Sequence, residues 1–194
     1  SKKKPKGLAD AFILGKTFIQ KDNVALILGD NFFYGQSLTD KLEKSLTHTV
    51  GSRIFLKNVK TPENFGVAKI INNKIKKIIE KPKKFISNYA ITGLYFFDNK
   101  VIDYAKKLKP SKRGEIEITD ILNIYKNSGN LHYEHIGRGA IWSDAGKIED
   151  MTNISSFVQS VEKVQSIKIA CLEEISLSKK WINKKTILKN INFY

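Results

Sequence analysis

Charged side chains stand just beyond several predicted strands of this sequence. Asp30 follows the apolar run 24–28 and a glycine, and Asp144 closes the segment 140–144. In open α/β sheets, ligands sit in the crevice beyond the carboxyl ends of the strands. A carboxylate there is well placed to hold a metal ion or a polar substrate. Asp30 is therefore the first site candidate, and capping of the next helix is the alternative role for it.

Three further positions indicate binding chemistry. Glu80 and Lys81 place an acid and a base side by side where the apolar strand 75–79 ends. Arg113 is one of only three arginines among the 34 basic residues. An arginine kept in a lysine-rich chain indicates a need for the planar guanidinium that binds phosphate or carboxylate with two hydrogen bonds, although a chance surface position is equally consistent.

Gly93 lies in the middle of a predicted strand, 89–97. Glycine weakens a strand unless something must approach the backbone closely. A ligand is one such neighbour, and a bulky side chain is the other. Both interpretations remain open from the sequence.

An α/β arrangement is needed to position these residues. The run 24–28 predicts a strand buried on both faces, Asn72 and Asn73 predict a hairpin turn, and Ser37 is a candidate helix N-cap. Near the start, Ala9, Phe12, Ile13 and Phe18 have the spacing of one apolar helix stripe. The other predicted strands are 53–57, 67–71, 75–79, 89–97, 131–136 and 140–144. The other predicted helices are 38–46, 99–108, one that follows the segment 111–120 and runs to about 126, 148–164 and 172–182.

Length and composition indicate a globular protein with one main domain. The chain has 194 residues, of which 41% are hydrophobic and 10% aromatic. No apolar run approaches membrane-spanning length and no signal-peptide pattern is present, so we expect a soluble, cytoplasmic protein with no membrane partner. The single cysteine, Cys171, excludes an internal disulfide. The three histidines, His48, His132 and His135, lack metal-ligand spacing.

The formal net charge of +15 raises the question of nucleic-acid binding. The lysines are spread along the whole chain beside many isoleucines and asparagines, a composition typical of an AT-rich coding sequence. We therefore expect no nucleic-acid partner, and the charge would at most steer small anionic substrates toward the protein.

Seven short motifs, taken in order, resemble those of bacterial glucose-1-phosphate thymidylyltransferases, which belong to the sugar nucleotidyltransferase family. They cover nearly the whole chain, and the runs starting at Asn88 and Arg113 are the most specific. The motifs are Gly7-Leu-Ala-Asp-Ala, Leu28-Gly-Asp-Asn-Phe-Phe-Tyr-Gly35, Asn64-Phe-Gly-Val67, Glu80-Lys-Pro82, Asn88-Tyr-Ala-Ile-Thr-Gly-Leu-Tyr-Phe96, Lys109-Pro-Ser-Lys-Arg-Gly-Glu-Ile-Glu-Ile-Thr-Asp120 and Gly139-Ala-Ile-Trp-Ser-Asp-Ala-Gly146.

The resemblance implies an α/β fold with a Rossmann-like, three-layer mixed β-sheet flanked by helices. Residues 1–147 would form the remainder of the nucleotidyltransferase domain, and 148–194 a C-terminal helical region. The implied reaction joins glucose 1-phosphate to dTTP and gives dTDP-glucose and pyrophosphate, which enters dTDP-rhamnose synthesis. The resemblance also implies a homo-oligomer, which is a tetramer in the family.

The resemblance assigns roles to individual residues. Asp30 and Asp144 match the two carboxylates that hold Mg²⁺ in the family, a metal that prefers one or two carboxylates together with phosphate oxygens. Lys81 and Arg113 match the catalytic residues that bind the sugar phosphate.

The remaining implied positions bind or enclose the substrates. Glu80 would accept hydrogen bonds from sugar hydroxyls, and Trp142 would form a wall of the site, although a core role suits a tryptophan equally well. Gly66 and Gly93 would let the backbone approach the sugar. The positions matching those beside the nucleotide base are Gly7 and Leu8.

One departure from the family pattern concerns the triphosphate. The family begins with a strand and a Gly-rich loop that grip the nucleotide triphosphate, whereas this sequence begins with the basic run 1–6, which contains Pro5 and cannot form such a phosphate cradle. The first strand and Gly-rich loop are therefore expected to be lacking, which should leave an apolar sheet edge uncovered. Phe65 also replaces the usual Tyr, and Ala145 the usual Thr.

These departures predict a fragment or decayed copy that keeps the metal and sugar-phosphate half of the site and is inactive alone. A non-catalytic regulatory or scaffold paralogue is the alternative from a different class of function. A uridylyltransferase of the same family is the alternative within the enzyme class.

Overall fold

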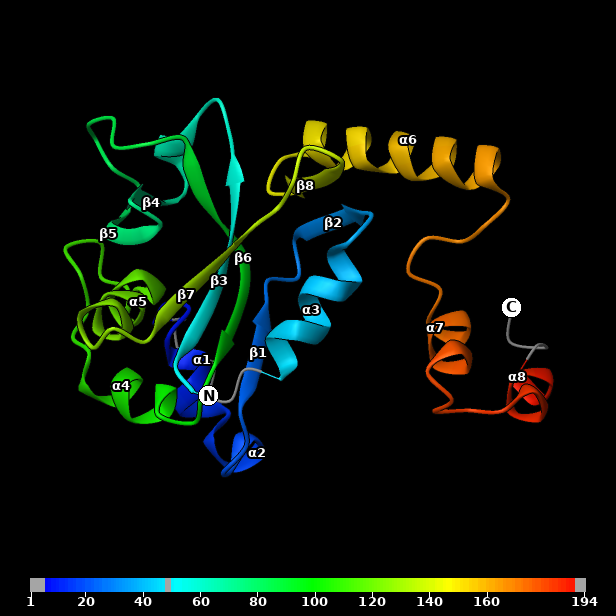
Figure 1. Ribbon diagram of the computed structural model, residues 1–194, viewed down its shortest axis with the longest axis horizontal. Helices are drawn as coiled ribbons and strands as arrows, with labels where there is room; N and C mark the ends of the chain where they lie inside the picture. Colours follow the sequence, from blue (N-terminus) through cyan, green and yellow to red (C-terminus); the bar gives the residue numbers. More distant parts are fainter. Residues whose placement is uncertain (1–5, 48–49, 191–194) are drawn as a thin grey trace. The chain divides into compact units, whose positions relative to one another are not determined.

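The computed structural model describes residues 6–47 and 50–190 (Figure 1). The chain divides into two compact units, Ser1–Asp144 and Ala145–Tyr194. The domain boundary predicted after residue 147 stays a prediction, because compactness alone does not show independent folding. The statements above about residues 1–5, His48 and the chain after Asn190 lie outside the described residues.

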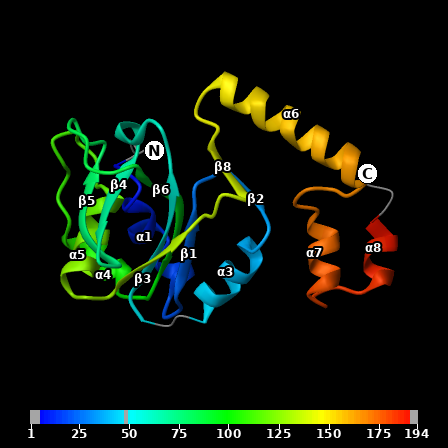
Figure 2. The same cartoon turned by 45° about the horizontal axis from the view of Figure 1, so that its top comes forward.

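A six-stranded mixed sheet forms the centre of the first unit, and it is curled (Figures 1 and 2). The strand order is β5-β4-β6-β3-β7, and β1 pairs with β6 beside this path. The pairing of β3 with β7 is parallel and the other pairings are antiparallel. The strands are β1 (Val24–Ile27), β3 (Ser52–Asn58), β4 (Gly66–Ile71), β5 (Lys74–Glu80), β6 (Tyr89–Phe97) and β7 (Leu131–His135).

A separate two-stranded sheet pairs β2 (Asn31–Gly35) with β8 (Ala140–Asp144) in antiparallel register. Asn31 lies opposite Asp144, and Gly35 lies opposite Ala140. Gly35 has a φ of +147°, and a side chain there would collide with Ala140. Glycine therefore allows the two strands to meet at this end of the ribbon.

Helices cover both faces of the central sheet. The first unit contains α1 (Asp10–Leu14), α2 (Lys16–Ile19), α3 (Leu38–Leu46), the 3₁₀ turn η1 (Pro62–Asn64), α4 (Val101–Lys107) and α5 (Ile118–Asn127). Helices α1, α4 and α5 pack on one face, whereas α3 and the β2–β8 ribbon cover the other (Figures 1 and 2). This is the predicted mixed α/β layering.

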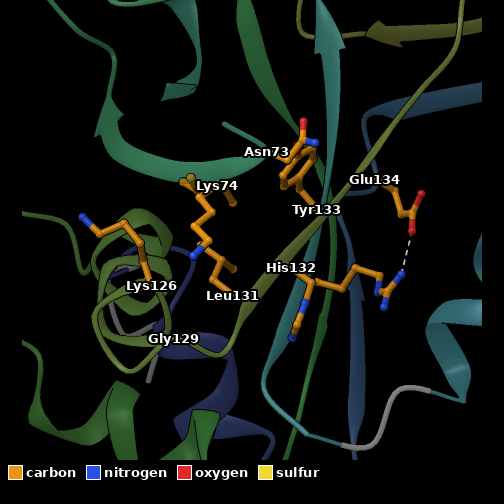
Figure 3. A pocket seen from close by; sticks show the side chains of 10 residues that line it. Asn73, Lys74, Lys126, Gly129, Leu131, His132, Tyr133 and Glu134 are labelled. Atoms are coloured by element: carbon orange, nitrogen blue, oxygen red, sulfur yellow. Dashed lines mark hydrogen bonds and ion pairs between the residues drawn. The ribbon is translucent and has the colours of Figure 1, made fainter. Parts of the chain in front are cut away.

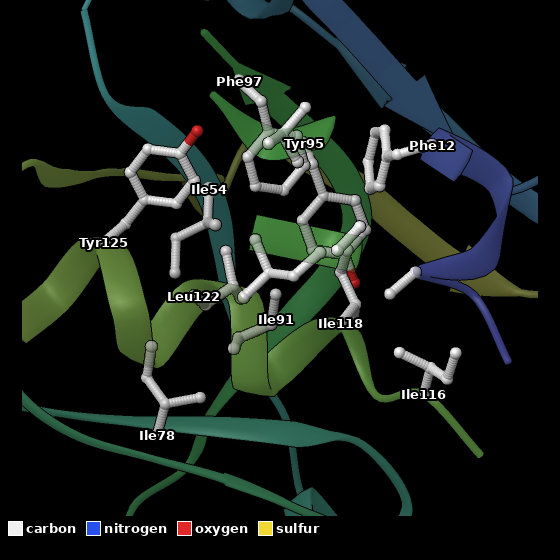
Figure 4. Close-up of a cluster of buried hydrophobic side chains, with 14 of the residues drawn as sticks. Phe12, Ile54, Ile78, Ile91, Tyr95, Phe97, Ile116, Ile118, Leu122 and Tyr125 are labelled. Carbon is white, nitrogen blue, oxygen red and sulfur yellow. The ribbon is translucent and has the colours of Figure 1, made fainter. Parts of the chain in front are cut away.

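The larger of two hydrophobic clusters lies beneath α1, α4 and α5 (Figure 4). Phe97 is at its centre, with Phe12 edge-on at a ring-centroid distance of 5.2 Å and Tyr125 at 5.8 Å. The hydroxyl of Tyr125 donates to Asp98 Oδ1 at 2.5 Å, and Asp98 Oδ2 accepts from the backbone N–H of Gly51. This core fixes α5, whose first turn reaches the site described below.

Several predicted elements are confirmed. The strand 89–97 and the helix 38–46 have the predicted bounds. Asn72 and Asn73 form the hairpin turn between β4 and β5, with φ of 50° and 56°. Two consecutive positive φ values match the hairpin turn that suits the twist of the flanking strands, and asparagine tolerates them better than most residues.

Three local predictions were wrong, and one strand was missed. Strand β1 is not buried on both faces, because its residues alternate between half-buried and exposed. Phe18 is 90% exposed, since the helix breaks at Gly15 and α2 continues in another direction. Ser37 precedes α3 but makes no capping hydrogen bond, because its φ of 63° turns the side chain away from the first turn. Strand β2 was not predicted at all.

The outer edge of β1 is uncovered, as expected. In the described part of the chain, β1 pairs only with β6, and Ile27 is 57% exposed. Such an edge with an exposed apolar side chain is open to pairing with a further strand.

The second unit consists of α6 (Ile148–Gln165), α7 (Leu172–Ser178) and α8 (Lys184–Asn190). Helix α6 follows the prediction, α7 ends four residues before the predicted 182, and α8 was not predicted. Neither α6 nor α7 has a buried residue. Within residues 6–47 and 50–190, no helix combines the length and apolar character needed to cross a bilayer.

Candidate active site

A cavity of about 210 Å³ lies where β5 ends, between the loop that leads into α5 and the end of β8. Eight of the ten predicted site residues line it, so residues far apart in the sequence converge as expected. The eight are Leu8, Gly66, Glu80, Lys81, Gly93, Arg113, Trp142 and Asp144. Gly7 and Asp30 lie outside the lining, each next to a residue that belongs to it.

The β2–β8 ribbon places the two predicted metal ligands at the same end. Asp144 lies opposite Asn31, and Asp30 directly precedes Asn31. The amide of Asn31 donates to Asp30 Oδ1 at 2.8 Å and accepts from the indole N–H of Trp142 at 2.6 Å. Asn31 therefore orients Asp30 and Trp142 at once. The sequence prediction missed this role, although the position of an amide beside Asp30 was a signal.

Two carboxylates at this end of the ribbon suit Mg²⁺, which needs few protein ligands when phosphate oxygens and water complete its octahedron. Asp30 is exposed and Asp144 half-buried, so both are open to such a complex. Among the described residues, no group of three or more acidic, histidine or cysteine side chains could hold a metal alone. The two carboxylates fit a metal ion whose remaining ligands are phosphate oxygens and water.

Arg113 lies among three carboxylates. Its guanidinium is 3.7 Å from Glu80, 3.6 Å from Glu115 and 3.5 Å from Glu117. Glu117 is held in turn by the hydroxyl of Ser111 at 2.8 Å. The three carboxylates carry more negative charge than the arginine carries positive charge. Their ion pairs keep Arg113 at the rim of the cavity. A bound phosphate would compete with them for its hydrogen bonds.

The Glu80 carboxyl has a raised pKa. Burial raises this pKa most, followed by the negative charge of Glu117, while Arg113 and Lys81 lower it in part and Thr119 donates a hydrogen bond to the carboxylate. A half-buried carboxylate at the edge of a polar cavity suits a sugar hydroxyl. The bound hydroxyl would donate the hydrogen bond that water donates to the carboxylate in the free protein.

Gly66 leaves the space that the Glu80 carboxylate occupies. A Cβ at this position would lie 3.0 Å from Thr119 Cγ2 and 3.2 Å from Glu80 Oε2. Both contacts are tighter than most packed side chains show, so a larger residue would require Thr119 or the carboxylate to shift by a few tenths of an ångström. The function of Gly66 visible here is to position Glu80.

Gly93 is also crowded, but by the protein itself. A Cβ there would lie 2.9 Å from Leu28 and from the amide nitrogen of Asn31. Of the two interpretations left open by the sequence, the bulky neighbour accounts for this glycine. Gly93 still lines the cavity through its backbone.

Leu8 reaches the cavity near the start of the described chain, and Gly7 precedes it outside the lining. The carbonyl of Lys6 accepts from Ile116 N–H at 2.6 Å, and Ala9 N–H donates to Ile116 O at 3.2 Å. Gly7, with a φ of +112°, lies against the Ile116 backbone between these bonds, where a side chain would not fit. Leu8 is thereby turned toward the cavity.

Lys81 follows β5 with a φ of +41°, an unusual value for a residue with a long side chain. Its N–H donates to Phe65 O at 3.0 Å, which ties the end of β5 to η1. Phe65 meets Trp142 edge-to-face at 5.0 Å. The two rings form an apolar wall on this side of the cavity. The role of Trp142 in substrate binding stays a prediction.

Lys57, on β3, holds the loop that enters β8, and no sequence signal pointed to this role. Its ammonium donates to the carbonyls of Gly137 at 3.0 Å and Ala140 at 2.6 Å. Burial lowers the pKa of this ammonium. These two bonds fix the loop that enters β8, and β8 carries both Trp142 and Asp144.

Residues 1–161 match the family model described as nucleotidyl transferase. The chain belongs to this family. It is 46% identical over 184 residues to glucose-1-phosphate thymidylyltransferase of Neisseria meningitidis, covering 94% of this chain and 64% of that protein. The corresponding protein of Xanthomonas campestris is 41% identical, with 94% and 62% coverage. The chain therefore spans less than two thirds of the length of these relatives.

Solved structures agree with this assignment. A Bacillus anthracis protein assigned to glucose-1-phosphate thymidylyltransferase, in complex with a sucrose, superposes with a TM-score of 0.72 at 41% identity, covering 80% of this chain and 62% of that chain. A UDP-glucose pyrophosphorylase complexed with UDP-glucose gives a TM-score of 0.69 at 23% identity, with 82% and 64% coverage, and shows the shared fold alone.

Proposed function

We propose that this chain carries the metal and sugar-phosphate half of an enzyme that transfers a thymidylyl group from dTTP to glucose 1-phosphate. The observation that carries this proposal is the convergence of Glu80, Lys81, Arg113 and Asp144 in one cavity. A hydroxyl-binding acid, two cations and a carboxylate for a metal are the groups that a sugar phosphate and a nucleotide require together.

In this reaction a phosphate oxygen of glucose 1-phosphate attacks the α-phosphorus of dTTP. The new oxygen–phosphorus bond gives dTDP-glucose, and the bond between the α-phosphorus and the bridging oxygen breaks to release pyrophosphate. Catalysis of such a displacement consists mainly of positioning and charge stabilisation.

Each side chain has one task in this scheme. Lys81 and Arg113 hold the sugar phosphate in line, and Glu80 orients the sugar through its hydroxyls. Asp30 and Asp144 would hold Mg²⁺, which when bound supplies positive charge against the reacting phosphates. Phe65 and Trp142 exclude water from one side. Leu8 lines the part of the cavity proposed for the base, and Gly7 lies next to it outside the lining.

A coupled pyrophosphate-release assay with dTTP, glucose 1-phosphate and Mg²⁺ tests the proposal. It is run on this chain alone and together with the part of the Neisseria meningitidis relative that this chain does not cover. We expect activity only in the mixture, because nothing in this sequence matches the triphosphate-binding loop. No activity in either, with the chain folded and unable to bind glucose 1-phosphate, would favour a regulatory or scaffold protein instead.

The proposal also covers the donor nucleotide, the cellular compartment, the pathway and the oligomeric state. The names of the relatives support dTTP over UTP, and parallel assays with the two nucleotides measure the preference directly. We further propose that the protein acts in the cytoplasm on the route to dTDP-rhamnose as a homo-oligomer. Sedimentation velocity at several concentrations tests the oligomeric state.

A further inference from the structure

A second hollow, of about 650 Å³, lies at the outer edge of β7 (Figure 3). It is bounded by the β4–β5 hairpin, by the last turn of α5 and the turn after it, and by β7. Its volume is within the range of small-molecule sites, about 300–1,000 Å³. The lining residues are Arg53, Asn73, Lys74, Ile75, Lys126, Gly129, Leu131, His132, Tyr133 and Glu134.

This hollow is separate from the candidate active site, because the two share no lining residue. Lys74 begins β5 and lines the hollow, whereas Glu80 ends β5 and lines the active-site cavity. The strand rises by about 3.4 Å per residue, which places these two positions about 20 Å apart. The substrates proposed above do not reach the hollow from their own site.

The charge of the hollow is positive. Glu134 is paired with Arg53 at 2.7 Å and also lies 3.6 Å from Lys41, so its charge is compensated. Lys74 and Lys126 form no ion pair with the residues that the structure describes. Figure 3 shows both on the side of β7 away from Glu134, with the Lys74 ammonium turned toward Leu131.

The end of α5 does not oppose a bound anion. Its last carbonyls are already satisfied, since Ser128, Gly129 and Asn130 donate to Ile124, Lys126 and Tyr125. The negative end of the helix is therefore capped by backbone donors. Arg53 pairs with Glu134 on the side of β7 away from both lysines, so it takes no part in holding the phosphate.

The floor of the hollow is apolar. Ile75, Leu131 and Tyr133 are partly buried and pack against the main core cluster. Ligand sites generally combine such a floor with a few placed polar groups. We propose that this hollow binds a small phosphate ester, with Lys74 and Lys126 contacting the phosphate and Leu131, Ile75 and Tyr133 contacting the organic part.

The test is a titration of the full chain, followed by amide NMR, with inorganic phosphate and with phenyl phosphate. Shifts are expected at Asn73, Lys74, Leu131 and His132. Phenyl phosphate should bind several-fold more tightly, because only it places an apolar ring on the floor. Shifts confined to residues of the active-site cavity, such as Gly66 and Lys81, would overturn the proposal while leaving the proposed function intact.

The double variant K74E/K126E should weaken binding of phenyl phosphate at the hollow by about tenfold or more, because two charged contacts become repulsive. The matched control is K21E/K100E, which removes the same charge at two exposed lysines elsewhere. At an ionic strength of about 0.15 M, charges more than about 8 Å away are largely screened, so the control should bind nearly as the parent does.

An equal loss in both double variants would show a general charge effect and overturn the proposal. Lysines at open strand edges also prevent aggregation. If K74E/K126E aggregates but its soluble fraction binds phenyl phosphate like the parent, that protective role replaces the proposed one. The milder variant K74Q/K126Q, checked by circular dichroism, covers the case in which the charge reversal prevents folding.

Discussion

The two sides of the candidate active site are built in different ways. On the sugar side, Glu80 is half-buried, receives a hydrogen bond from Thr119 and lies beside Arg113. On the metal side, Asp30 is exposed and its one described partner is the neighbouring Asn31. The first side is a preformed pocket, whereas the second presents one exposed and one half-buried carboxylate. We expect from this difference that the proposed sugar phosphate binds before the proposed metal.

Removing a metal-side carboxylate should give the largest loss of activity. D144N is expected to lower kcat in the complemented assay by about a hundredfold or more, since the metal charge stabilises the transferring phosphoryl group. Its unfolding midpoint in urea should stay close to that of the parent. Full activity of D144N at saturating Mg²⁺ would remove Asp144 from the metal site.

A change beside Glu80 should instead lower stability and ligand affinity, in contrast to D144N. In G66A, the added methyl group meets Thr119 and Glu80 at 3.0 and 3.2 Å, so the stability should fall by about 1–3 kcal/mol and the affinity for glucose 1-phosphate should fall with it. Urea unfolding and isothermal titration measure the two effects. The matched control is G137A, because nothing lies within 4 Å of a Cβ at Gly137. Equal behaviour of G66A and G137A would contradict the preformed pocket.

Lys57 connects the β8 end to the central sheet. K57M keeps the aliphatic stem but leaves the carbonyls of Gly137 and Ala140 without their donor, at an expected cost of about 1–3 kcal/mol in unfolding free energy. K57R should recover part of that loss. Amide hydrogen exchange in β8 should accelerate in K57M, and unchanged exchange there would show that the loop is held by other contacts.

The smallest expected effect is a pH dependence from Glu80. Its folded-state pKa is raised, mainly by burial, so the folded state binds the proton more tightly than the unfolded state. This contribution to stability is full below the ordinary glutamate pKa of about 4.3 and declines as the pH rises through the raised value. E80Q should make the urea midpoint less dependent on pH across this window. The same slope in E80Q would assign the effect to another group.

Local patterns predicted much of the fold because their causes are local. The apolar strand 89–97 and the helix 38–46 are specified by residue spacing, and the Asn72–Asn73 turn by the tolerance of asparagine for positive φ. The burial of β1 could not be predicted this way. An apolar run shows what a strand can bury, whereas its neighbours decide which face is covered.

The site shows the same division. The sequence by itself determined which residue types were present, and the order of the motifs pointed to the family that the comparisons confirm. Only the tertiary structure decided that Asp144 lies opposite Asn31, the neighbour of Asp30, through the pairing of β2 with β8 across more than a hundred residues of chain. It also decided that Arg113 lies among three carboxylates and that Lys57 holds the loop before β8. These contacts depend on long-range packing, because side-chain surroundings are set by the elements that fold against a segment and not by the segment itself.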